Sequence, residues 1–115
     1  MLSASTKKIL FVCTVNRMRS LTAEHIFKHD RRFEVKSAGT DISATRQINR
    51  ELLDWAQYIV VMENHHRNTI RKKFPDIYKK KKIICLNIPD VFPYMDGELI
   101  ALLKIKMQEI FGKEM

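Results

Sequence analysis

Four short hydrophobic runs are spaced along the chain, separated by segments with a different periodicity. Residues 9–12, 58–62 and 83–86 are almost continuously apolar, a pattern typical of strands that are buried on both faces. Residues 33–35 alternate apolar and polar positions and lead into Ser37-Ala38-Gly39-Thr40, which predicts a further short strand closed by a glycine turn. The chain is therefore expected to contain four strands.

Between and after these runs, apolar residues recur at helical spacing, which predicts helices. The apolar positions are Ala23, Ile26 and Phe27 in the first helix; Ile48, Leu52 and Trp55 in the second; and Ile100, Leu103, Met107, Ile110 and Phe111 in the last. Residues 28–32 end the first helix. Ser43 or Thr45 is expected to cap the second, and Asp96 the last. A basic helix is predicted over residues 64–74 and is stopped by Pro75.

Strands and helices that alternate in this way predict a parallel sheet covered by helices on both faces, an α/β fold. A length of 115 residues suits one domain with a proper core, and no repeat or linker divides the sequence. Ligands of such sheets bind beyond the carboxyl ends of the strands. Cys13 lies at one of these ends, directly before the first predicted helix.

Composition narrows the class of protein and of partner. Hydrophobic residues make up 45% and charged residues 30%, as in folded soluble proteins. The formal net charge of +8 favours anionic partners, although solubility alone would also account for it. No apolar run approaches the roughly 20 residues of a membrane span, and the N-terminus lacks a signal-peptide hydrophobic region, so no membrane partner is expected. Two cysteines are too few for a disulfide framework, which favours the cytoplasm.

The chemically most informative stretch is VCTVNRMRS, residues 12–20. A cysteine at a helix N-terminus is favoured as the thiolate, and the N–H groups of the loop would converge there on a phosphate-sized dianion. Arg19 adds a planar fork for two phosphoryl oxygens. Ser20 can donate a hydroxyl hydrogen bond to the sulfur, and Asn16 suits a left-handed backbone in a tight loop. The alternative interpretation is a buried structural cysteine beside a surface arginine.

The stretch VCTVNRMRSLTAEHIF resembles the active-site loop and first helix of the low-molecular-weight protein tyrosine phosphatases, whose pattern is V-C-x-G-N-x-x-R-S-P-x-A-E. The resemblance continues in order through Ser37-Ala38-Gly39-Thr40, Arg46-Gln47, residues 55–62, His66, Phe74-Pro75 and Ile88-Pro89-Asp90. It implies a phosphotyrosine protein phosphatase I-like fold: a three-layer sandwich with a four-stranded parallel sheet flanked by helices, forming one low-molecular-weight phosphatase-like domain over residues 1–115.

The resemblance also implies an activity and assigns roles to residues. The chain would hydrolyse phosphate monoesters, foremost protein phosphotyrosine, through a phosphocysteine on Cys13. Arg19 would clamp the transferring group, and Asp90 would protonate the leaving oxygen and then activate water. The implied phosphate-binding residues are Thr14, Val15, Asn16, Arg17, Met18, Arg19 and Ser20. Asn16, Ser20 and Ser37 would support the loop.

No metal or other cofactor is implied, because the arginine and the amides already neutralise the transferring group. The expected partners are a phosphorylated protein or a small phosphomonoester. Phosphate, sulfate or vanadate would bind the loop as inhibitors, and nucleic acid is a less favoured partner.

Several residues depart from the family pattern. Val15 stands in place of a glycine, which could distort the cradle, and Leu21 and Val91 replace prolines. Asp96 is a second candidate for the acid, but its expected role as a helix cap explains it, so Asp90 is preferred.

The chain is also short between Thr40 and Arg46, where typical members have a longer segment that walls the cleft. We therefore expect a more open cleft, with Phe92, Tyr94 and Arg17 along its side.

Other polar residues receive simpler interpretations. His25 and His29 stand at i and i+4 but have no third ligand in view, so they are interpreted as solvated. The basic residues within 65–73 and the lysine run 79–82 are interpreted as solvated surface, with docking of a phosphorylated or nucleic-acid partner as the alternative. Cys85 and Trp55 are expected to pack in the core.

Two other functions remain open. An arsenate reductase could use the same fold, but it needs further cysteines to relay a disulfide, and Met18 rather than cysteine precedes Arg19. A non-catalytic basic module could use the loop to bind phosphate or nucleic acid. The net charge and Val15 favour that module, whereas the presence of Cys13, Arg19 and an acid disfavours it.

Overall fold

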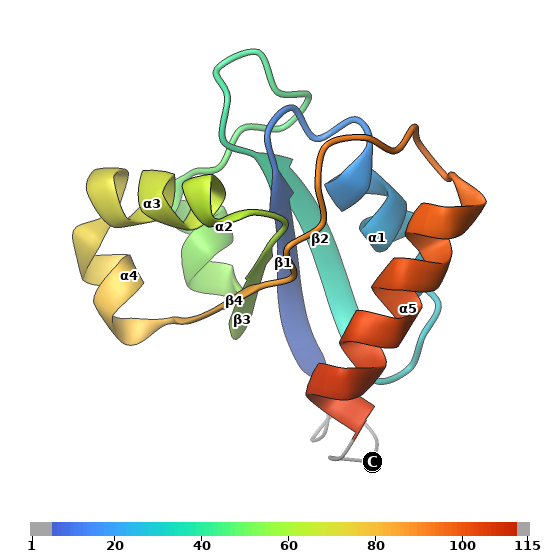
Figure 1. Ribbon diagram of the computed structural model, residues 1–115. Helices are drawn as coiled ribbons and strands as arrows, with labels where there is room; N and C mark the ends of the chain where they lie inside the picture. The colour runs from blue at the N-terminus through green and yellow to red at the C-terminus, as the bar shows by residue number, and fades with distance from the viewer. Residues whose placement is uncertain (1–5, 113–115) are drawn as a thin grey trace.

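The computed structural model describes residues 6–112 and shows one parallel sheet with helices on both faces (Figure 1). Its strands are β1 (Lys7–Cys13), β2 (Phe33–Gly39), β3 (Tyr58–Val61) and β4 (Lys82–Cys85), in the order β2-β1-β3-β4. The helices are α1 (Arg19–Phe27), α2 (Arg50–Trp55), α3 (Asn64–Lys73), α4 (Pro75–Lys80) and α5 (Gly97–Phe111). The predicted α/β fold with a four-stranded parallel sheet is confirmed.

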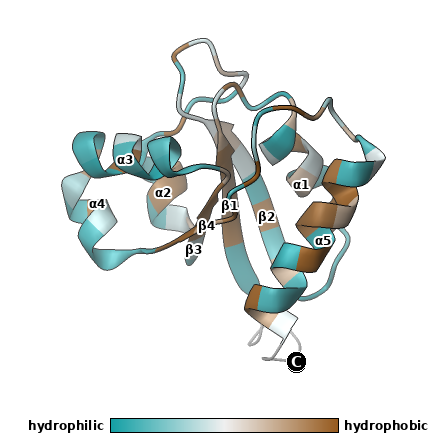
Figure 2. Ribbon diagram, in the orientation of Figure 1, coloured by the Kyte–Doolittle hydropathy of each residue, from teal (hydrophilic) through white to brown (hydrophobic). Residues whose placement is uncertain are grey.

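Strand β1 is the centre of two separate cores, because its side chains alternate between the faces of the sheet. Ile9, Phe11 and Cys13 belong to the cluster packed with α1 and α5, whereas Leu10 and Val12 belong to the cluster packed with α2, α3 and α4. Figure 2 shows apolar residues along α5 and a largely hydrophilic α3 and α4. All five side chains are buried, which explains the continuous apolar run in the sequence.

The predictions about the helices were correct only in part. Pro75 stops α3 as predicted, but it also begins α4 as its first residue, where its fixed φ and missing N–H are tolerated, and the sequence analysis did not predict that helix. Helix α2 starts later than its apolar pattern suggests, and Asn49 caps it, accepting from the Leu52 N–H, instead of Ser43 or Thr45. The predicted cap of α5 by Asp96 is confirmed.

The lysine run is also not uniformly solvated. Lys81 Nζ donates to the carbonyl oxygens of Asp54 and Ala56 at 2.7 and 2.6 Å. These carbonyls lie at the C-terminal end of α2, where a cation is favourable. Lys81 therefore ties the start of β4 to a neighbouring helix.

The topology brings the loops after β1, β2, β3 and β4 to one edge of the sheet (Figure 1). In the order β2-β1-β3-β4 the connection after β1 runs toward one side of the sheet and the connection after β3 toward the other. The carboxyl ends of β1 and β3 therefore form the switch point where α/β proteins bind ligands. None of the described helices combines the length and apolar character needed to cross a bilayer.

Candidate active site

The loop between β1 and α1 uses its carbonyl groups within the protein and leaves its N–H groups free. The carbonyls of Cys13, Thr14 and Val15 accept hydrogen bonds at 2.9, 2.9 and 3.1 Å from the N–H groups of residues 40, 41 and 45. Within residues 6–112, no N–H of residues 14–18 donates to a protein acceptor. Five adjacent unpaired donors at the start of a helix are what an anion site requires.

Two residues allow this loop to turn so tightly. Asn16 has a φ of 58°, in the left-handed region that asparagine tolerates better than most residues. A Cβ on Gly39 would lie 2.5 Å from Thr14 O and 2.7 Å from the Ala44 Cβ, so only glycine fits there. Val15 is not among the residues with positive φ. The structure therefore shows why a β-branched residue is compatible with this loop.

A chain of buried hydrogen bonds runs from the cysteine sulfur to a carboxylate on α1. Cys13 Sγ lies 2.9 Å from Ser20 Oγ, and the Asn16 amide donates to both Ser20 Oγ and Ser37 Oγ at 2.9 Å. The Ser37 hydroxyl donates in turn to Glu24. Because Ser20 Oγ already accepts from Asn16, its own proton is left for Ala38 O, at 3.3 Å, or for a Cys13 thiolate.

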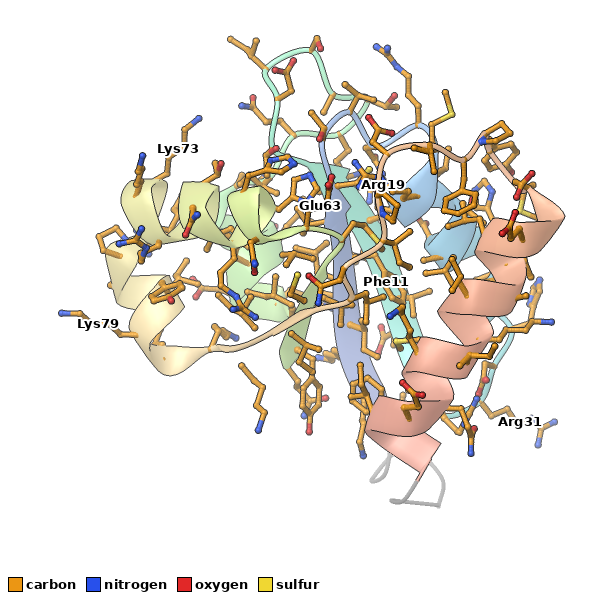
Figure 3. The ribbon with its side chains drawn as sticks, viewed as in Figure 1. Phe11, Arg19, Arg31, Glu63, Lys73 and Lys79 are labelled. Atoms are coloured by element: carbon orange, nitrogen blue, oxygen red, sulfur yellow. The ribbon has the colours of Figure 1, made fainter. Side chains whose placement is uncertain are left out.

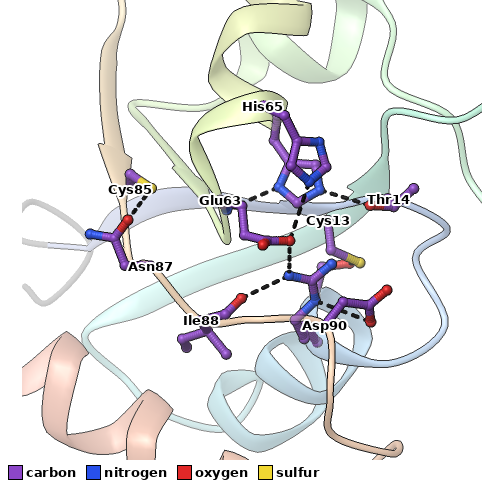
Figure 4. A network of polar contacts seen from close by, with 11 residues as sticks. Cys13, Thr14, Glu63, His65, Cys85, Asn87, Ile88 and Asp90 are labelled. Atoms are coloured by element: carbon purple, nitrogen blue, oxygen red, sulfur yellow. Dashed lines mark hydrogen bonds and ion pairs between the residues drawn. The ribbon is translucent and has the colours of Figure 1, made fainter.

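Arg19 is the largest fully buried charged side chain, with 1% of its surface exposed. Its Nη1 donates to Glu63 Oε1 at 2.6 Å and to Ile88 O at 2.7 Å. Figure 3 labels Arg19 and Glu63 near the upper end of the sheet, and dashed lines in Figure 4 lead to the labelled Glu63 and Ile88. Its Nε is buried without a hydrogen-bond partner, and no described residue accepts from Nη2. The guanidinium is thus fixed by one nitrogen and presents its other edge to a ligand.

Glu63 and His66 connect this arginine to the cysteine loop from the start of α3. The Arg19 hydrogen bond holds the pKa of the Glu63 carboxyl below its usual range. Burial lowers the pKa of His66 to about 3, so its ring is neutral. Because His66 Nδ1 accepts from the Glu63 N–H at 3.0 Å, Nε2 carries the proton and donates to Thr14 Oγ1 at 2.9 Å.

The two acid candidates lie in different environments. Asp90 is on the loop beyond Ile88, 66% of its side chain is exposed, and its Oδ1 lies 3.7 Å from Arg19 Nε. The Asp96 carboxylate instead accepts from the N–H groups of Glu98 and Leu99 at 3.0 and 3.1 Å. Asp96 is therefore occupied as a helix cap, and Asp90 is the candidate that lies beside Arg19.

The predicted cleft residues separate in the structure. Arg17, on the loop between β1 and α1, is exposed and donates to Ser43 O at 3.1 Å. Phe92 is half-buried against the core formed with α1 and α5. Tyr94 contacts His25 on α1, with Oη 2.5 Å from Nδ1, so His25 is not simply solvated.

Cys85 is placed on the opposite side of the sheet from Cys13. It packs with the cluster of α2, α3 and α4, whereas Cys13 belongs to the other cluster. β3 also lies between their two strands, which separates them by two strand spacings, about 10 Å. This placement is unsuited to a direct disulfide relay.

Glu63, Glu24 and the contact of His66 were not identified from the sequence. One signal was available for Glu63: it is a carboxylate just after the third buried strand, at the edge of the sheet where Cys13 lies. Glu24 stands five residues after Arg19 on a helix that the pattern predicted. Its contact with Ser37 depends on the packing of α1 against β2, which periodicity does not specify.

Glu63, His65 and His66 form the one group of potential metal ligands within the described residues that lie close together. Both ring nitrogens of His66 are already hydrogen-bonded, and Glu63 is paired with Arg19. Since these atoms are in use, the group does not fit a metal ion.

Comparisons with known proteins agree with this geometry. The model of the low molecular weight phosphotyrosine protein phosphatase family matches residues 8–50. A sequence comparison with curated proteins gives no match.

Several solved structures share the fold. The YwlE arginine phosphatase from Geobacillus stearothermophilus is 24% identical, with a TM-score of 0.70 and 94% of each chain covered. A low molecular weight protein tyrosine phosphatase from Streptococcus pyogenes is 20% identical, with a TM-score of 0.73, and 95% of this chain and 93% of that chain are covered. The tyrosine phosphatase Wzb from Escherichia coli K30, solved with phosphate, is 20% identical, with a TM-score of 0.75 and coverage of 93% and 97%.

The resemblance stated from the sequence is thereby confirmed, as is the predicted fold. The matching family model, over residues 8–50, is that of phosphotyrosine protein phosphatases, and the similar structures are named as phosphatases.

Proposed function

We propose, from the match of residues 8–50 to the low-molecular-weight phosphatase family and from the geometry of its site, that the chain hydrolyses phosphate monoesters through a phosphocysteine. The observation that carries the proposal is Arg19. A buried guanidinium that is fixed through Nη1 and has no acceptor at Nε leaves an uncompensated donor edge, which costs free energy unless an anion binds there. The unpaired N–H groups of residues 14–18 supply the rest of the cradle.

In the proposed mechanism, the Cys13 thiolate attacks the phosphorus atom in line with the leaving oxygen. The Ser20 hydroxyl donates to the thiolate, and the free edge of Arg19 binds two equatorial oxygens as the phosphoryl group transfers. Asp90 gives its proton to the leaving oxygen, which departs as a neutral alcohol. The resulting Asp90 carboxylate then takes a proton from a water molecule, which attacks the phosphocysteine and releases phosphate and the thiolate.

The substrate we propose is a protein phosphotyrosine or a related aryl phosphate. Six large hydrophobic side chains are strongly exposed in the described residues, and five of them lie on the loops at the edge of the sheet where Cys13 lies. They are Met18, Ile42, Val91, Tyr94 and Met95. Exposed apolar side chains on the loops at the same edge of the sheet as Cys13 suit an aryl ester or a protein surface better than a sugar phosphate.

The remaining parts of the proposal concern organisation and compartment. Residues 1–115 would form a single domain of this kind. Both cysteines are free, which suits a reducing compartment such as the cytoplasm, where phosphorylated proteins would be the partners. Inorganic phosphate, sulfate and vanadate are expected to compete for the cradle.

Hydrolysis of an aryl phosphate by the purified protein without added metal tests this function. We expect turnover by the wild type and none by Cys13→Ser, while vanadate still binds that variant because the amides and Arg19 remain. Turnover that survives the substitution would rule out the mechanism. Binding of vanadate without turnover in the wild type would favour the non-catalytic phosphate-binding module.

A panel of substrates then tests the proposed substrate class. It should contain phosphotyrosine, phosphoserine and phosphoarginine peptides together with sugar phosphates and nucleotides. Phosphoarginine belongs in it because one of the similar structures is named as an arginine phosphatase. The proposal predicts the highest kcat/KM with phosphotyrosine peptides.

A further inference from the structure

Within residues 6–112, no hydrogen bond holds the carboxyl group of Asp90. Its single charged contact in the described residues is Arg19 Nε at 3.7 Å, longer than a hydrogen bond, and most of the side chain is exposed. The next residue, Val91, is 71% exposed. The position of this carboxyl group therefore depends on how the backbone of loop 89–96 is held.

The near end of that loop is fixed to the sheet and to the arginine. The Ile88 N–H donates to Met62 O at 2.8 Å, and the Ile88 carbonyl accepts from Arg19. These bonds lie before Asp90 in the chain, so they fix where the loop begins but not its course afterwards.

The far end is attached to α1 at two points one turn apart. The Met95 N–H donates to the buried Thr22 Oγ1 at 2.9 Å. The Tyr94 hydroxyl is hydrogen-bonded to His25 Nδ1, and the two rings pack edge to face with centroids 5.5 Å apart. Met95 has a φ of 59°, so the loop adopts a backbone that a methionine rarely takes in order to reach this helix.

We propose that Tyr94 and His25 are positioning residues for the general acid. Their contact fixes the exposed loop on α1, the helix whose first residue is Arg19, and so sets the distance from the Asp90 carboxyl group to the leaving oxygen. The inference rests on the proposed phosphatase function. The physical reason is that Asp90 can transfer its proton only within hydrogen-bonding distance of the leaving oxygen, so a displacement of about 1 Å lowers the rate substantially.

Leaving-group dependence separates this role from a merely structural one. An activated aryl phosphate such as 2,4-dinitrophenyl phosphate needs no proton on its leaving oxygen, whereas phenyl phosphate does. The parameter to compare is kcat/KM, because it covers the steps up to departure of the leaving group. Tyr94→Phe removes the hydroxyl and keeps the ring, and His25→Ala removes both contacts.

We expect kcat/KM for phenyl phosphate to fall about tenfold in both variants and that for dinitrophenyl phosphate to stay within about twofold. His29→Ala is the matched control, because His29 lies just past the end of α1 and is exposed. Tyr78→Phe controls for the loss of a tyrosine hydroxyl on α4. Both controls should leave both substrates unchanged.

An equal fall for the two substrates, or no fall for phenyl phosphate, would overturn the positioning role. Failure of the proposed function would look different, because the wild type would then not turn over even dinitrophenyl phosphate. Thermal unfolding of each variant confirms that the folded protein is being compared.

Discussion

Asp90 and Asp96 are separated by six positions in the segment before α5, and their carboxyl groups have different partners. The Asp96 carboxylate accepts hydrogen bonds from two N–H groups in the first turn of α5. The sequence predicted this cap, because Asp96 directly precedes a segment with apolar residues at helical spacing. Asp90 has no such commitment and lies nearest to Arg19 Nε. The sequence identified both carboxylates and predicted Asp96 as the helix cap, and the structure adds the two N–H groups that Asp96 accepts from.

Replacing each aspartate in turn tests this assignment. Asp90→Asn should lower kcat/KM for phenyl phosphate by roughly 10²–10⁴ because proton donation is lost. Asp96→Asn should retain activity and stability, since asparagine caps helices equally well, whereas Asp96→Ala should lose about 1 kcal/mol of unfolding free energy. Steady-state kinetics and urea unfolding give both results. If Asp96→Asn showed the kinetic loss instead, the acid would be Asp96.

The end of strand β2 shows how one element shapes the site formed by another. Gly39 pairs through its N–H with Arg46 O and through its carbonyl with the Ile48 N–H, both at 2.8 Å. Its missing side chain is the space into which the Thr14 carbonyl fits. The short segment between these pairing points donates the N–H groups of residues 40, 41 and 45 to the carbonyls of residues 13–15.

Gly39→Ala should therefore damage the cradle, whereas Gly97→Ala should not. The added Cβ at residue 39 meets two backbone atoms at 3.0 Å or less, so the phosphate loop must move, and we expect vanadate binding and turnover to be lost. At Gly97 nothing lies within 4 Å, and alanine should stabilise α5 by up to about 1 kcal/mol. Calorimetric titration with vanadate and thermal unfolding measure the two effects. Unaltered vanadate binding by Gly39→Ala would contradict this role.

The elements themselves were largely predictable, because burial on both faces and helical spacing leave strong patterns. The apolar runs at residues 9–12, 58–62 and 83–86 coincide with β1, β3 and β4 to within two residues at each end, and the apolar stripe that includes Leu103 predicted α5. Helix α4 was missed because proline ends one helix and begins another with the same residue. The loop between β1 and α1 could be predicted because it is local in sequence. The partners of Arg19 and Thr14 are Glu63, Ile88 and His66, which follow β3 and β4 in the chain, so these contacts depend on tertiary packing.

At the scale of the whole molecule, His66 links the phosphate loop to the layer of helices on the other face. Its ring is fully buried, and burial lowers its pKa to about 3, below the usual value of about 6.5. Between pH 3 and pH 6.5, His66 is therefore protonated in the unfolded chain and neutral in the folded chain. This contribution to stability is complete above pH 6.5 and is lost as the pH falls toward 3.

Unfolding in urea at pH 7 and pH 5 measures this linkage. His66 should account for a loss of about 2 kcal/mol over that interval. In His66→Gln, which keeps an amide able to hydrogen-bond at this site, that part of the loss should be absent. An equal loss in the two proteins would show that protonation of His66 does not limit acid stability.

Chemical trapping tests the central claim, that Cys13 carries the phosphoryl group, most directly. Asp90→Asn should release dinitrophenolate and then stall, because the base that activates water is missing. Acid quenching followed by peptide mass spectrometry should find one phosphoryl group on Cys13. Release of dinitrophenolate with no modified peptide, or a phosphoryl group on another residue, would contradict the account.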